Sequence, residues 1–109
     1  MGTITQSIIR LPDKQSSETV AYIINWHKII PSTDTLSGVA HAIFKVSDNS
    51  DVSSSMVAAE DFDATLVQAE CDVQGGTDGE EYYLRARAST TGGLLFEQDY
   101  KFRVRDLGQ

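Results

Sequence analysis

The sequence predicts an all-β fold, an antiparallel β-sandwich of about seven strands. The chain has 109 residues, 40% of them hydrophobic, which is enough for one compact core and too little for two ordinary domains. Apolar and polar residues alternate with period two at intervals of about ten to fifteen residues, and no window of a dozen residues has helical periodicity. Clusters of turn-forming residues separate these runs. We therefore expect residues 1–109 to form a single domain.

The alternating runs define the expected strands. In chain order they are residues 3–11, 19–26, 38–46, 54–58, 65–73, 82–89 and 94–105. Both prolines, Pro12 and Pro31, fall between runs, where a missing N–H costs no ladder hydrogen bond. The serine-rich segment 47–55 is expected to be a mobile loop or a short edge strand.

The second run supplies the best candidate anchors of the core. Tyr22, Ile24 and Trp26 lie on one face of this strand because they are two residues apart. Large aromatic side chains bury the most apolar area. We expect these three residues to hold one sheet against the other.

The sixth run has a clear inner face. Tyr82 and Leu84 alternate with Tyr83, Arg85 and Arg87, so the first pair faces the core and the arginines face solvent. If the strand faced the other way, Tyr83 would be buried instead of Tyr82. Leu84 lies on the same face as Tyr82, so its apolar side chain favours burial of Tyr82. Tyr82 then approximates a tyrosine corner, a buried tyrosine whose hydroxyl bonds to upstream backbone.

The seventh run pairs with the sixth across the three-residue loop 91–93, which supplies a glycine for the left-handed position of such hairpins. The inner face is expected to consist of Leu94, Phe96, Tyr100, Phe102 and Val104, interrupted by Gln98. The implied register places Arg87 opposite Glu97 and Arg85 opposite Asp99. Opposed unlike charges contribute roughly 0.2–1 kcal/mol each. We interpret Arg85, Arg87, Glu97 and Asp99 as a structural charge ladder.

Candidate catalytic or metal-binding residues form no recognised motif. Cys71 alternates with apolar neighbours and is expected to be a buried thiol, and His27 and His41 do not have metal-ligand spacing. The acidic segments 48–51 and 60–63 do not match a calcium loop, so we expect solvated loops there. The sequence predicts no enzyme, no catalytic residue, no metal and no cofactor.

Charge and cysteine content limit the partners. The net charge of -7 repels phosphate backbones, so we expect no nucleic acid partner. A single cysteine excludes an internal disulfide and fits folding in a reducing cytoplasm. No apolar stretch reaches the roughly 20 residues of a membrane span, and we expect no membrane association.

Two resemblances add to these expectations. The tryptophan of the second strand and the glycine-rich entry to the sixth, residues 74–82, resemble immunoglobulin-like modules of the fibronectin type III kind. More narrowly, the chain is similar to small tailed-bacteriophage virion proteins of the fiber–tail adaptor or neck and tail structural type. The similarity is carried by residues 20–26, 34–36, 53–55, 74–82, 90–93 and 102–106.

The narrower resemblance implies a non-enzymatic virion structural protein, an adaptor or connector at the neck, tail or fiber attachment site. It would fold in the host cytoplasm and dock to other virion proteins and to copies of itself in a cyclic ring. The expected contact elements are the first strand, with its apolar residues Ile4, Ile8 and Ile9, and the loops at one end of the sandwich. The alternative is a free-standing adhesion or carbohydrate-binding module, for which Tyr83 and Phe62 are the candidate exposed aromatics.

Overall fold

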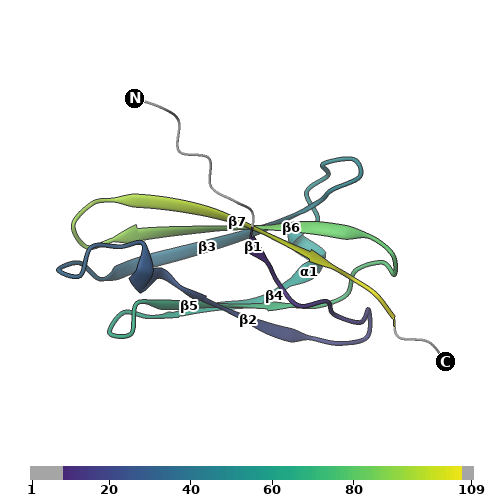
Figure 1. Ribbon diagram of the computed structural model, residues 1–109, viewed down its shortest axis with the longest axis horizontal. Coiled ribbons are helices and arrows are strands. Elements are labelled where there is room, and N and C mark those ends of the chain that lie inside the picture. The colour runs from purple at the N-terminus through teal and green to yellow at the C-terminus, as the bar shows by residue number, and fades with distance from the viewer. Residues whose placement is uncertain (1–8, 107–109) are drawn as a thin grey trace.

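A computed structural model describes residues 9–106 as two β-sheets packed face to face (Figure 1). The strands are β1 (Ile9–Arg10), β2 (Val20–Asn25), β3 (Leu36–Lys45), β4 (Val57–Asp63), β5 (Gln68–Val73), β6 (Glu81–Thr90) and β7 (Leu95–Arg103). A 3₁₀ helix η1 (Trp26–Lys28) follows β2, and a short helix α1 (Ser53–Met56) precedes β4. One sheet has the order β1-β7-β6-β3 and the other β2-β5-β4.

The strand order agrees with an immunoglobulin-like sandwich. The second, fifth and fourth strands share one sheet, and the third, sixth and seventh share the other, as in constant-type immunoglobulin domains. The expected all-β sandwich is therefore confirmed. Six strands have six or more residues, so the count reaches seven only through β1, which pairs in parallel with β7. Of the expected strand 3–11, residues 3–8 lie outside the described residues.

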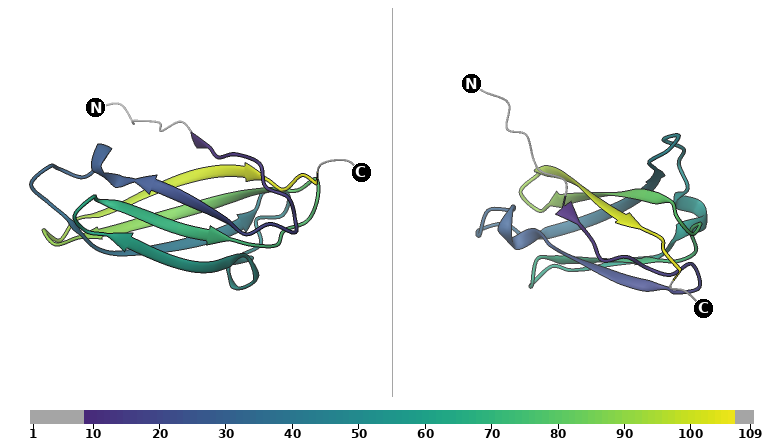
Figure 2. Two further views of the ribbon diagram at one scale, coloured as in Figure 1. Left: turned by 90° about the horizontal axis from the view of Figure 1, so that it is seen from below. Right: turned by 45° about the vertical axis from the view of Figure 1, so that its right-hand side comes forward.

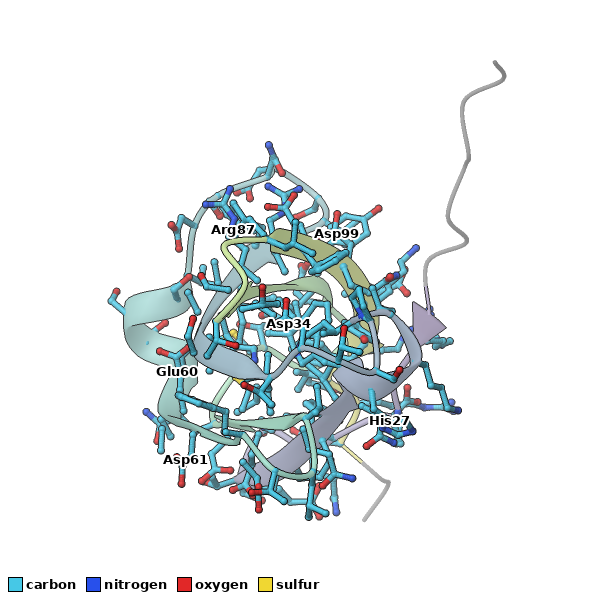
Figure 3. The ribbon with its side chains drawn as sticks, turned by 90° about the vertical axis from the view of Figure 1, so that its left-hand side faces the viewer. His27, Asp34, Glu60, Asp61, Arg87 and Asp99 are labelled. Atoms are coloured by element: carbon cyan, nitrogen blue, oxygen red, sulfur yellow. The ribbon has the colours of Figure 1, made fainter. Side chains whose placement is uncertain are left out.

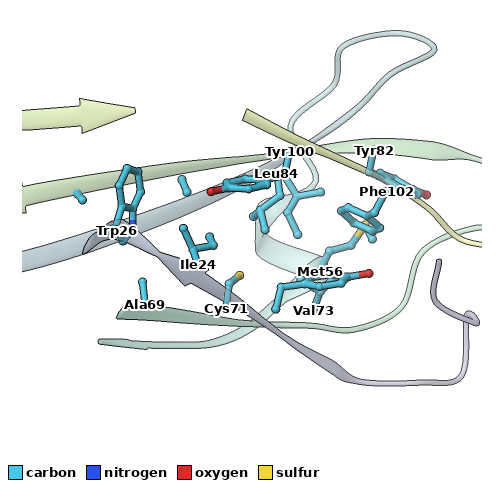
Figure 4. Packing of buried hydrophobic residues seen from close by; sticks show 14 of the residues in the cluster. Ile24, Trp26, Met56, Ala69, Cys71, Val73, Tyr82, Leu84, Tyr100 and Phe102 are labelled. Atoms are coloured by element: carbon cyan, nitrogen blue, oxygen red, sulfur yellow. The ribbon is translucent and has the colours of Figure 1, made fainter. Parts of the chain in front are cut away.

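The core lies between the two sheets (Figure 4). All six expected anchors are buried: Tyr22, Ile24, Trp26, Tyr82, Leu84 and Phe102. The ring centres of Tyr22 and Tyr82 each lie 5.5 Å from the ring centre of Phe102. The Tyr82 hydroxyl accepts a hydrogen bond from the Thr77 N–H at 3.0 Å. The tyrosine-corner prediction is confirmed, and Tyr82 rather than Tyr83 is the buried residue of the pair.

The segment between β3 and β4 differs from the sequence prediction. Residues 53–56 form α1 where a strand over 54–58 was expected, and residues 60–63 belong to β4 instead of a loop. The Asp51 carboxylate accepts hydrogen bonds from the Ser53 N–H at 2.9 Å and from the Ser53 hydroxyl at 2.6 Å. Such local bonds compete with extended pairing, so the strand begins only at Val57.

Two boundaries of the expected strands were also wrong. β5 begins at Gln68, not at residue 65, because the Asp63 carboxylate accepts the N–H groups of Thr65 and Leu66 and holds a turn. Leu94, expected in the core, is 45% exposed and precedes β7. The hairpin turn itself is as expected, because Gly93 takes the left-handed conformation with φ of +86°.

Candidate docking surfaces

The loops at one end of the sandwich form a connected surface, here called the loop end. It consists of η1 with residues 29–35, the β4–β5 turn at residues 64–67 and the β6–β7 turn at residues 91–94. Figure 3 views the molecule from this end, with Asp34 near the middle, Arg87 and Asp99 on one side and Asp61 on the other. The large exposed hydrophobic side chains of the described residues lie in these loops or in the strands next to them: Ile29, Leu66 and Leu94 in the loops, Leu95 at the start of β7, and Ile23 on β2.

The loop end is held in place by Asp34. One carboxylate oxygen of Asp34 accepts hydrogen bonds from the Thr91 hydroxyl at 2.9 Å and from the Gly92 N–H at 3.0 Å. The Thr91 N–H in turn donates to the Thr35 carbonyl at 3.0 Å. Hydrogen bonds from hydroxyl and N–H groups, first of all from Thr90, lower the pKa of Asp34. The Trp26 N–H donates to the Val67 carbonyl at 3.0 Å and so ties η1 to the β4–β5 turn, which means that all three loops are cross-linked.

The opposite end is polar and is built around a buried lysine that sequence reasoning missed. Lys14 is 1% exposed, and its ammonium donates to the carbonyls of Gln15 and Gly75 at 2.6 Å each. Burial lowers the pKa of Lys14, while Glu18 and Asp106 oppose that shift. The hydrogen bond to the Gly75 carbonyl joins the segment after β1 to the loop between β5 and β6. No local signal identifies it, because Gly75 lies 61 residues away.

The outer face of the β1-β7-β6-β3 sheet is covered by paired charges. The observed register places Arg85 opposite Asp99 and Arg87 opposite Glu97, as expected from the sequence. Arg85 binds Asp99 through two bonds of 3.0 and 3.3 Å, and Arg87 Nε lies 2.6 Å from Glu97 Oε2. We call these four residues the ladder. Such half-exposed pairs fix strand register more than they add stability.

The outer face of the β2-β5-β4 sheet has a different character. Its carboxylates are Asp61 and Asp63 of β4 and Glu70 and Asp72 of β5, here called the acidic face. Within residues 9–106 none of the four makes an ion pair. Sequence reasoning placed 60–63 in a loop and so did not foresee that this face would form.

Polar groups close the outer edge of β3. The His41 N–H donates to the Glu60 carboxylate at 2.6 Å, and the Ile43 N–H donates to the Ser53 hydroxyl at 2.8 Å. The Lys45 N–H donates to the Ser50 carbonyl at 2.9 Å. His41 Nδ1 also lies 2.7 Å from the same Glu60 oxygen. An edge strand whose N–H groups are occupied is a poor template for another chain.

The remaining candidates for chemistry do not form a site. Cys71 is buried, and burial raises its pKa to about 12, with Glu60 and Asp72 adding to the shift, so it stays a neutral thiol. His27 and Glu60 lie on opposite sides of the view in Figure 3. Across the described part of the chain, no three histidine, cysteine or carboxylate side chains gather as a metal-binding group. Nor does that part contain a helix long and apolar enough to span a membrane.

The residues expected to form an interface are only partly visible. Ile4 and Ile8 lie outside the described residues, and the backbone of Ile9 pairs with Tyr100 of the same molecule. Of the aromatics considered for sugar binding, Tyr83 and Phe62 are each half-buried. The Lys101 ammonium lies 5.9 Å from the centre of the Tyr83 ring, which covers the flat surface that a sugar would need.

Comparison with known protein families decides what kind of protein carries these surfaces. A model of the family described as podophage GP4 fiber-tail adaptor protein gp77 matches residues 14–104. The chain belongs to this family. It is therefore a structural protein of a bacteriophage virion, and the resemblance inferred from the sequence is confirmed. A comparison of this chain with curated protein sequences gives no match.

Proposed function

We propose that this fiber–tail adaptor is a non-enzymatic connector that joins other virion proteins at the neck, tail or fiber attachment site through preformed docking surfaces. The family match over residues 14–104 carries the proposal. The loop end supports it, because exposed apolar side chains gathered on cross-linked loops are typical of protein interaction sites. Loops that are already ordered bind at little entropic cost.

The first test is the protein composition of purified virions. Quantitative mass spectrometry should find the chain at a ring-like copy number, of order a dozen, relative to the other virion proteins. Such a number would support copies arranged in a cyclic ring. We further propose that each copy folds in the host cytoplasm before assembly. Absence of the chain from particles would refute the connector role.

The loop end can be tested directly with exposed leucines. Leu95, at the start of β7 beside the loop end, is 69% exposed, and Leu66 in the β4–β5 turn is 57% exposed, so Leu95→Ser and Leu66→Ser should leave the fold intact. Both variants should be incorporated into particles several-fold less well. Thr19→Ser, an exposed position at the opposite end, is the control and should be incorporated normally. Equal incorporation of all three would exclude the loop end as a docking site.

The N-terminal segment is a second proposed contact. Ile4 and Ile8 are apolar enough to add a strand to the edge of a neighbouring copy, whereas the backbone of Ile9 already pairs with Tyr100. Removal of residues 1–8 keeps β1 and should give a folded monomer that no longer forms rings. Size-exclusion chromatography with light scattering measures this, and a truncated chain that still assembles would argue against the contact.

A further inference from the structure

The acidic face has an unusual composition for a sheet surface. The register places Ile23 of β2, Glu70 of β5 and Asp61 of β4 in one row across the three strands. Ile23 is 50% exposed, so an apolar side chain stands in solvent beside carboxylates. Figure 2 shows β2, β5 and β4 as one layer whose outer side is not covered by any other element of the described chain.

The carboxylates of this face repel one another. Asp61 lies directly opposite Glu70, and like charges in that position destabilise a sheet. The pKa of Glu70 is raised, first by its interaction with Asp72 and also by Asp61. One oxygen of Asp72 is buried without a hydrogen-bond partner. The ladder on the other sheet contains no such uncompensated group, since each of its carboxylates contacts an arginine.

A groove runs along the same face. Its volume is about 400 Å³, and its lining combines apolar side chains with the rim carboxylates Asp61, Asp63 and Glu70. Its exposed apolar side chains are Ile23 and Ala64, whereas Phe62 and Ala69 line it from strands whose inner face holds their side chains against the core. No lysine or arginine lines it. The groove therefore offers a mainly polar, acidic surface beside the half-exposed apolar side chain of Ile23.

We propose that the acidic face docks a basic segment of another virion protein, whose lysine or arginine side chains lie in this groove. The stems of such side chains cover apolar surface while their charged ends reach carboxylates. Complementary charge also speeds association and rejects acidic partners. The inference rests on the proposed connector function and adds to it, because a connector must bind more than one other virion protein.

Carboxylate labelling in intact virions tests the inference. Carbodiimide with glycine ethyl ester should modify Asp61, Asp63 and Glu70 in the free protein and in disassembled particles. In intact virions the labelling should fall several-fold. Unchanged labelling in virions that contain the chain would overturn this inference and leave the connector function standing, whereas absence of the chain from virions would refute both.

Zero-length cross-linking identifies the occupant. Carbodiimide without added amine joins a carboxylate to a lysine that it contacts. We expect links from Asp61, Asp63 or Glu70 to lysines of one other virion protein. Links to the lysines of a second copy of this chain, such as Lys28 or Lys45, would overturn the assignment of a different partner.

Neutral variants separate docking from a structural role. The double variant Asp61→Asn with Glu70→Gln removes the repulsion, so its melting temperature should rise by a few degrees. Its incorporation into virions should nevertheless fall about tenfold. Glu97→Gln, on the ladder, is the matched control and should keep normal incorporation without a gain in melting temperature. A stabilised double variant that is incorporated normally would show that the acidic face has no partner.

Discussion

Replacement of Gly76 by alanine tests how tightly the loop between β5 and β6 is packed on the core. Gly76 has φ of +94°, and an added Cβ would lie 2.5 Å from Val104 Cγ2 and 3.0 Å from Met56 Cε. Val104 and Met56 are both buried. A left-handed backbone costs an L-residue about 1–2 kcal/mol, and overpacking of a core adds about 1–3 kcal/mol. Gly76→Ala should therefore lower the free energy of unfolding by about 2–5 kcal/mol.

Gly79→Ala is the matched control for this prediction. Gly79 has φ of +88°, and nothing lies within 4 Å of the added Cβ. This variant should lose only the backbone contribution of about 1–2 kcal/mol. Equilibrium unfolding in urea, followed by fluorescence of the buried single tryptophan Trp26, measures both losses. If the two variants lose the same stability, contact with Val104 and Met56 does not restrict position 76.

Three further predictions concern the ladder, the buried lysine and acid stability. Arg85→Asp and Asp99→Arg should each destabilise the protein, and the double variant should recover most of the loss because the pair is restored in reverse; purely additive losses in urea titrations would contradict the ladder. Lys14→Met should lower the free energy of unfolding by about 1.5–3 kcal/mol, since its charged hydrogen bonds to two carbonyls are lost; an unchanged urea midpoint would show that these bonds contribute nothing. The pKa of Asp34 is held below its ordinary value near 3.8, first by the Thr90 hydroxyl, so its stabilising effect is complete above that pH and is lost as the pH falls through the lower, folded value. Unfolding midpoints from pH 7 to pH 2 should therefore fall less steeply below pH 4 in Asp34→Asn than in the parent chain, and identical profiles would argue against this role.

The sequence predicts the β6–β7 hairpin well because two local signals agree there. Period-two alternation fixes which side chains face the core, and the short loop with Gly93 fixes the register of Arg85 with Asp99. The fold class follows from the same alternation repeated along the chain. Leu94 shows the limit of this reasoning, because hydropathy alone cannot distinguish a core leucine from one placed in an exposed turn.

The candidate surfaces were harder to predict because they depend on contacts between distant residues. Four acidic or aromatic residues in sequence, 60–63, resemble a solvated loop, and only pairing with β5 makes them a strand. Lys14 looks like an ordinary turn residue until the Gly75 carbonyl is placed beside it. The loop end also requires three turns, far apart in the chain, to meet at one end of the sandwich. No local pattern contains that information.

The distribution of cations explains why the two sheets differ in charge. The chain has nine lysines and arginines, and five of them form ion pairs on the β1-β7-β6-β3 sheet and its edge: Arg10, Arg85, Arg87, Lys101 and Arg103. The acidic face has no such pairs among the described residues, so much of its charge remains available to a partner. Exposed charges interact over a Debye length of about 3 Å in 1 M salt, compared with about 8 Å at physiological ionic strength. High salt should therefore release a partner from the acidic face while the core, which consists of apolar contacts, stays folded.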